Sequence, residues 1–122
     1  MNNSTILIIE SDEWLAEQYE RILGDEYKVL WAKNIVAAMQ IVDSVMPDLI
    51  VADILLTGGT IFGLLHELQS YYDTGNIPII VSTNLASELS IDDLRPYGVR
   101  LILDKNSMMP RDLLLEARKI LS

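Results

Sequence analysis

Four short apolar runs in this sequence lead directly into side chains that can carry chemistry. The first two runs are followed by carboxylates, the third by hydroxyls and the fourth by a carboxylate and an amine. Crowded carboxylates either raise one another's pKa or bind a hard cation such as Mg²⁺. The groups are Glu10, Ser11 and Asp12 after residues 6–9, Asp53 after residues 49–52, Ser82 and Thr83 after residues 79–81, and Asp104 and Lys105 after residues 101–103.

This combination of groups suits phosphoryl transfer to Asp53. A free carboxylate can act as the nucleophile in such a reaction. A cation held by neighbouring acids, together with the ammonium of Lys105 and the hydroxyl of Thr83, would offset the charge that develops on the transferred group. The chemistry requires a fold that brings the ends of the four runs together.

Each group also has a purely structural interpretation. Asp53 can bond nearby backbone in a turn, and Thr83 can be present as a strand-favouring residue. Ser11 or Asp12 can cap a helix that begins at this point. Lys105 can be a solvated lysine, although its place opposite Asp53 favours a salt bridge.

The elements that would position these groups alternate along the chain. Continuous apolar runs of this length are typical of strands covered on both faces, and residues 27–31 form a weaker fifth candidate. Helical spacing of apolar residues separates the runs. The helical sets are Leu15, Tyr19, Ile22 and Leu23; Ile35, Ala38, Met39 and Val42; Phe62, Leu65, Leu68 and Tyr72; residues 89–94; and Leu113, Leu114, Ala117, Ile120 and Leu121.

Turn and start signals agree with this division. Pro96 and Gly98 should end the short fourth helix, and Pro110 is suited to the first turn of the fifth. Strands and helices in this order predict a three-layer α/β domain with a parallel sheet. In such sheets, ligands bind beyond the carboxyl ends of the strands, which is where the candidate groups lie.

Length and composition limit the functional classes. A chain of 122 residues predicts one domain over residues 1–122. A net charge of −9 argues against direct binding to nucleic acid or an anionic membrane surface. The sequence contains no cysteine and no apolar run that approaches a membrane span or a signal peptide. We therefore expect a cytoplasmic protein.

The motifs IIESDE, PDLIVADILLTGG, IPIIVSTN and ILDKN occur in this order on the predicted elements. Together they resemble the receiver domain of two-component response regulators over nearly the whole chain. The resemblance implies a flavodoxin-like (CheY-like) fold with the parallel strand order 2-1-3-4-5. It also implies that a histidine kinase or phosphotransfer protein phosphorylates Asp53 with Mg²⁺, with Thr83 as the switch hydroxyl and Lys105 as the phosphate-binding lysine.

The metal ligands implied by the resemblance are altered in this chain. They are Glu10, Asp53 and the backbone carbonyl of Leu55, with Asp12 as an additional acid. Ser11 stands where the family usually has a second acid, and a neutral hydroxyl is a poorer Mg²⁺ ligand than a carboxylate. We therefore expect weak Mg²⁺ binding.

Other positions also depart from the family pattern. Asn106 follows Lys105 where the family has a proline in a cis peptide, and we predict a trans bond because a cis bond before another residue costs about 2.5–4 kcal/mol. Ile102 replaces a common aromatic residue. The side chain of Leu55 cannot orient a hydrolytic water, which predicts slow autodephosphorylation. The only catalysis that we expect is, at most, self-catalysed phosphoryl transfer to Asp53.

The leading hypothesis is a phospho-receiver that changes its binding to a downstream partner or output domain. The alternative is a pseudo-receiver, an interaction module that is not controlled by phosphate. A third hypothesis, an FMN-binding flavodoxin-like protein, is disfavoured because carboxylates occupy the phosphate position after the first strand. The sequence leaves open the kinase, the partner, a homodimer and an output domain beyond residue 122.

Overall fold

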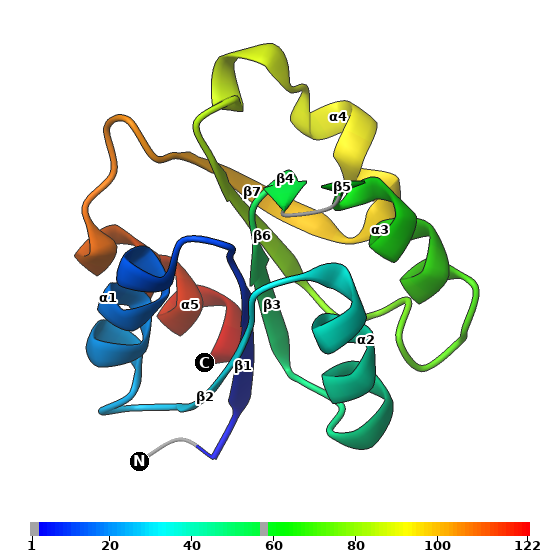
Figure 1. Cartoon of the computed structure of the whole chain (residues 1–122), viewed down its shortest axis with the longest axis horizontal. Helices are drawn as coiled ribbons and strands as arrows, with labels where there is room; N and C mark the ends of the chain where they lie inside the picture. The colour runs from blue at the N-terminus through cyan, green and yellow to red at the C-terminus, as the bar shows by residue number, and fades with distance from the viewer. Residues whose placement is uncertain (1–2, 57–58) are drawn as a thin grey trace.

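The computed structural model describes residues 3–56 and 59–122, so Thr57 and Gly58 of the LTGG motif lie outside the described residues. Five parallel strands form the central sheet in the order β2-β1-β3-β6-β7 (Figure 1). This is the predicted 2-1-3-4-5 order, in which β6 and β7 are the fourth and fifth strands of the sheet. The strands are β1 (Thr5–Ile9), β2 (Lys28–Ala32), β3 (Leu49–Ala52), β6 (Ile79–Thr83) and β7 (Val99–Asp104).

Helices cover both faces of this sheet and produce the three predicted layers (Figure 1). α1 (Glu13–Leu23) and α5 (Pro110–Leu121) pack on one face, where Tyr19 and Leu113 join the buried residues of β1 and β3. α2 (Ile35–Ser44), α3 (Phe62–Gln69) and α4 (Ile91–Leu94) pack on the other face. Because strands β1, β3 and β6 are covered on both sides, all of their residues are buried.

A short ribbon interrupts the alternation after β3. β4 (Leu55–Leu56) pairs antiparallel with β5 (Gly59–Thr60), and Leu55 lies opposite Thr60. Two residues per strand leave almost no periodic signal, and the sequence did not predict this ribbon. It begins two residues after Asp53 and so fixes the path of the chain beyond the end of β3.

Helix starts follow the polar and proline signals of the sequence. The carboxylate of Asp12 accepts a hydrogen bond from the backbone N–H of Leu15, which makes Asp12 the N-cap of α1. Asn34 caps α2 in the same way. Pro110 is the first residue of α5, where its missing N–H leaves no intrahelical hydrogen bond unmade.

Two predicted helices are shorter than expected. α3 ends at Gln69 rather than reaching Tyr72, because the hydroxyl of Thr74 bonds the carbonyl of Leu68 at 2.6 Å, the acceptor that the next helical turn would use. The predicted helix at 89–94 contains only α4, with 3₁₀ turns at Ala86–Glu88 and Arg95–Tyr97. Gly98 ends this segment with a φ of 89°, as the sequence predicted.

Among the described residues, no helix combines the length and the apolar character needed to cross a membrane.

Candidate functional site

The side chains of Lys105, Asp53 and Glu10 meet at the carboxyl edge of the sheet. Lys105 follows β7, Asp53 follows β3 and Glu10 follows β1. The Nζ atom of Lys105 lies 2.6 Å from Oδ2 of Asp53 and 2.5 Å from Oε1 of Glu10. Residues far apart in the sequence thus form one cluster, because parallel strands end at the same edge.

Glu10 is held from several directions. Its backbone N–H donates to the carbonyl of Ala32 at 3.0 Å, and its own carbonyl accepts from the indole N–H of Trp31 at 2.8 Å. The Oε2 atom accepts from the backbone N–H of Asp12 at 3.1 Å. With 3% of its surface exposed, Glu10 is a buried acid whose two oxygens both have partners.

Asp53 is held less tightly than Glu10. Its backbone N–H donates to the carbonyl of Ile9 at 3.2 Å, which holds the backbone of Asp53 beside β1. Oδ2 is bonded to Lys105, whereas Oδ1 accepts only a long hydrogen bond of 3.4 Å from the backbone of Leu55. The side chain is 12% exposed, so Oδ1 is the more available of its two oxygens.

Thr83 ends β6, the strand next to β3, and its side chain is buried. Its hydroxyl accepts a hydrogen bond from the backbone N–H of Leu85 at 3.2 Å and retains its own hydrogen to donate. The backbone carbonyl of Thr83 also accepts from the N–H of Lys105 at 3.0 Å. Thr83 is therefore linked both to the lysine and to the segment that leads into α4.

The two carboxylates stabilise the charge of Lys105. Burial of the ammonium opposes its charge, but the hydrogen bonds to Asp53 and Glu10 outweigh this effect and raise the pKa of Lys105 above its ordinary value. The lysine is thus protonated at neutral pH. A fixed positive charge beside Asp53 is suited to binding an anionic group on that side chain.

The remaining acids of the first loop lie differently. The exposed Asp12 directs its carboxylate to the N-terminus of α1, and Ser11 is also exposed. Among the residues that the structure describes, no three histidine or acidic side chains converge as a metal-binding group. Mg²⁺ commonly retains several waters and uses one or two protein carboxylates, a minimum that Glu10 and Asp53 meet. The donor set thus fits a water-rich site of low affinity.

The loop after β7 is held by hydrogen bonds of Asn106, which stands where the resembled family has a proline after the lysine. All described peptide bonds are trans, as predicted for the bond between Lys105 and Asn106. The carboxylate of Asp104 accepts from the backbone N–H of Asn106 at 2.8 Å, and the Asn106 amide donates to the carbonyl of Asn84 at 3.4 Å. Ile102, which replaces an aromatic residue, is half-buried against the core.

A buried hydroxyl pair beside the cluster was not predicted from the sequence. The hydroxyl oxygens of Tyr19 and Ser82 are 2.8 Å apart, and Ser82 also donates to Met108 Sδ at 3.4 Å. Tyr19 and Lys105 together line a small cavity of about 50 Å³. The helical pattern identified Tyr19 as a core residue, but only its pairing with a strand serine distinguishes it from an ordinary apolar contact.

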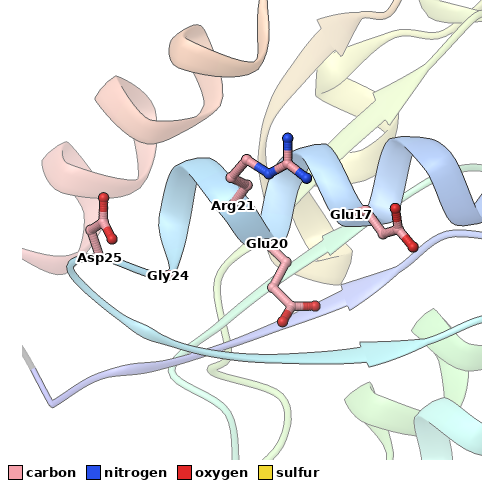
Figure 2. Close-up of a pocket in the computed structure, with 5 residues that line it drawn as sticks. All are labelled: Glu17, Glu20, Arg21, Gly24 and Asp25. Carbon is pink, nitrogen blue, oxygen red and sulfur yellow. The ribbon is translucent and has the colours of Figure 1, made fainter.

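A wide, open surface depression lies elsewhere, along α1 (Figure 2). It measures about 550 Å³ and is lined by Glu17, Glu20, Arg21, Gly24 and Asp25. All five residues are exposed, and none belongs to the cluster at the sheet edge. The polar cluster is therefore the better candidate for chemistry, although the cavity beside it measures only about 50 Å³.

The fold agrees with comparisons to known structures. The receiver domain of HemR from Leptospira biflexa is 27% identical, covers 98% of this chain and 95% of its own, and gives a TM-score of 0.83. A putative response regulator from Chloroflexus aurantiacus is also 27% identical, covers 98% of both chains and gives a TM-score of 0.81. The chemotaxis protein CheY4 of Vibrio cholerae, at 20% identity and a TM-score of 0.83, covers 98% of this chain and 99% of its own and shares the fold.

Sequence comparison points to the same family. A protein named histidine kinase P4 from Formosa agariphila is 27% identical over 84 residues, which are 69% of this chain. The matched region is only 6% of the length of that kinase. The family model described as the response regulator receiver domain matches residues 6–117, most of the chain. The chain belongs to the response regulator receiver domain family.

Proposed function

We propose that this receiver domain accepts a phosphoryl group on Asp53 and thereby changes its binding to a downstream partner. Family membership implies interaction with histidine kinases and output partners. The observation that carries the proposal is the partly buried ion pair between Asp53 and Lys105, beside Glu10 and next to the strand that ends in Thr83. A histidine kinase or phosphotransfer protein would supply the phosphoryl group.

The available oxygen of Asp53, Oδ1, is the natural nucleophile. It would form a bond to phosphorus while the bond from phosphorus to the donor's nitrogen breaks and the nitrogen keeps the electron pair. Lys105 would then extend one of its N–H groups to a phosphoryl oxygen, and Thr83 would donate its hydroxyl hydrogen to another. Both contacts strengthen as negative charge moves onto the transferred group.

Receiver domains generally bind Mg²⁺ at acidic residues. In this chain Glu10 and Asp53 would hold the ion, with the carbonyl of Leu55 as a backbone ligand. Bound Mg²⁺ would neutralise negative charge on the phosphoryl oxygens. Affinity should be low because Ser11 supplies no carboxylate and the ammonium of Lys105 already bonds both acids.

The change at Asp53 can reach the surface through Thr83. Its hydroxyl bonds the backbone of Leu85, which precedes the 3₁₀ turn Ala86–Glu88 and α4. Moving a two-state population from 1:99 to 99:1 requires about 5.5 kcal/mol, and charge-assisted hydrogen bonds supply roughly 1.5–3 kcal/mol each. New bonds from Lys105 and Thr83 could therefore supply much of that energy.

A second function, a pseudo-receiver that binds partners without phosphate control, is favoured by one specific observation. Lys105 already compensates the charges of Glu10 and Asp53, while Ser11 leaves the metal site without a further acid. A cluster that is electrostatically satisfied in its resting state has less need of a cation or phosphate. Such a module would retain the receiver fold and bind partners through its surface without phosphorylation of Asp53.

Titration with beryllofluoride and Mg²⁺, followed by backbone amide NMR, separates the two functions. A phospho-receiver should show saturable shifts at Asp53, Thr83, Leu85 and Lys105. An Asp53→Asn variant, which removes the nucleophilic oxygen at nearly constant size, should show no such shifts. Unchanged spectra of the wild-type protein would support the pseudo-receiver.

A further inference from the structure

We propose that the groove between α3 and α4 binds a basic amphipathic helix of a partner protein. The groove measures about 320 Å³ and lies on the face of the sheet opposite α1 and α5. None of Glu10, Asp53 or Lys105 lines it, so the proposal does not rest on phosphorylation of Asp53, although the groove includes Glu88 and α4, the segment that Thr83 would move. Its principal lining residues are Phe62, Glu88, Leu89, Asp93, Leu94 and Tyr97.

The floor of the groove is apolar and continuous with the core. Leu94 is buried, and Leu89 and Tyr97 are half-buried against the same cluster. Phe62, at the first position of α3, keeps 37% of its surface exposed. A concave surface with an exposed aromatic ring can receive a bulky apolar side chain, as in the binding of amphipathic helices to grooves.

The rim of the groove is acidic and uncompensated. Glu88 and Asp93 are both exposed, and neither forms a salt bridge within the described part of the chain. Their neighbour Asp92, by contrast, is paired with Arg95 at 2.5 Å. The two unpaired carboxylates line the same groove as its apolar residues and would meet lysine or arginine side chains next to an apolar anchor.

Charge complementarity favours a basic helix in this groove over a second copy of the chain or an anionic membrane. The chain has eighteen acidic and nine basic residues, for a net charge of −9, so a second copy would be repelled on approach. An anionic membrane would be repelled for the same reason. A partner helix with apolar residues at helical spacing and flanking lysines or arginines matches both the floor and the rim.

Fluorescence anisotropy with a labelled synthetic helix tests this assignment on the full chain. The peptide contains only leucine and lysine, with leucines along one face, and a shuffled peptide of the same composition serves as its control. Glu88→Gln combined with Asp93→Asn should weaken binding about tenfold. Phe62→Ala should weaken it to a similar extent, whereas Tyr72→Ala, which removes an aromatic ring that is 93% exposed outside the groove, should not.

A matched charge control uses the depression on α1 (Figure 2). Glu17→Gln combined with Glu20→Gln removes the same charge from the opposite face and should change affinity by less than about twofold at physiological ionic strength, where charges are screened over about 8 Å. Equal losses in both double variants, or equally tight binding of the shuffled peptide, would reduce the effect to net charge and overturn the proposal. Self-association that depends on Glu88 and Asp93 would overturn it as well. Circular dichroism confirms that each variant is folded.

Discussion

Lys105 and Asp53 form an ion pair of 2.6 Å in which the two side chains are only 11% and 12% exposed. The same ammonium lies 2.5 Å from Glu10, so one lysine compensates two carboxylates taken out of water. Buried charges are tolerated when they are paired, and removal of one partner leaves the other as an uncompensated buried charge. Lys105 is therefore a stabilising residue as well as a phosphate-binding candidate.

Removal of this charge should destabilise the fold. Lys105→Met should lower the free energy of unfolding by about 3 kcal/mol, because Glu10 and Asp53 would be left without a counter-charge. Addition of Asp53→Asn should recover part of that loss. Urea unfolding at neutral pH measures both effects, and a Lys105→Met variant as stable as the wild type would contradict this interpretation of the pair.

Restoring an acid at position 11 should strengthen Mg²⁺ binding. Ser11→Asp adds a carboxylate beside Glu10 and should raise the affinity about tenfold, or about 1.4 kcal/mol. Tryptophan fluorescence should report the titration, since the indole of Trp31 bonds the backbone carbonyl of Glu10 at 2.8 Å. Ser44→Asp, at the exposed C-terminal end of α2, is the matched control and should leave the affinity unchanged.

Asp12 should behave as a helix cap rather than a metal ligand. Asp12→Ala should cost about 1 kcal/mol of stability, because the backbone N–H of Leu15 loses its acceptor. Asp12→Asn keeps an acceptor oxygen and should retain most of that stability. It should also leave the Mg²⁺ affinity unchanged. A large loss of Mg²⁺ affinity in Asp12→Asn would show that this carboxylate turns toward the ion.

Stability should fall at alkaline pH through Tyr19 and Lys105. Burial raises the pKa of Tyr19 above its ordinary 10.0, while the Ser82 hydrogen bond and the charge of Lys105 act in the opposite direction. The pKa of Lys105 is also raised, from an ordinary 10.5. Since the unfolded chain loses these protons first, both contributions are complete below about pH 10 and decrease as the pH rises toward the folded-state values.

Tyr19→Phe isolates one of these contributions. The urea midpoint of the variant should decline less steeply between neutral pH and about pH 11 than that of the wild type. The variant also loses the contact with Ser82, which shifts its curve without giving it a pH slope. Parallel curves for the two proteins would show that the Tyr19 hydroxyl makes no contribution of its own to the alkaline loss.

The sheet and the meeting of its strand ends could be predicted because both follow from general rules. Apolar runs indicate buried strands, and parallel strands place Glu10, Asp53 and Lys105 at one edge whatever their separation in sequence. The pair formed by Lys105 and Glu10 joins residues 95 positions apart and still agrees with that expectation. The parallel topology of the sheet therefore accounts for most of what could be predicted about the site.

What could not be predicted depends on side-chain direction and on very short elements. The carboxylate of Asp12 is suited equally to capping and to a metal, and only its bond to Leu15 separates the two roles. The contact between Tyr19 and Ser82 joins residues 63 positions apart that belong to different apolar patterns. The end of α3 is fixed by the Thr74 hydroxyl, a hydrogen bond without a periodic signature.

The central claim, that Asp53 is a phosphoacceptor, is tested most directly by intact-mass measurement after incubation with acetyl phosphate and Mg²⁺. The wild-type protein should gain the mass of one phosphoryl group, and the Asp53→Asn variant should gain none. The modified protein should lose the group slowly, since Leu55 offers no polar side chain for an attacking water. An unchanged wild-type mass at saturating Mg²⁺, or the same gain in the Asp53→Asn variant, would contradict the claim.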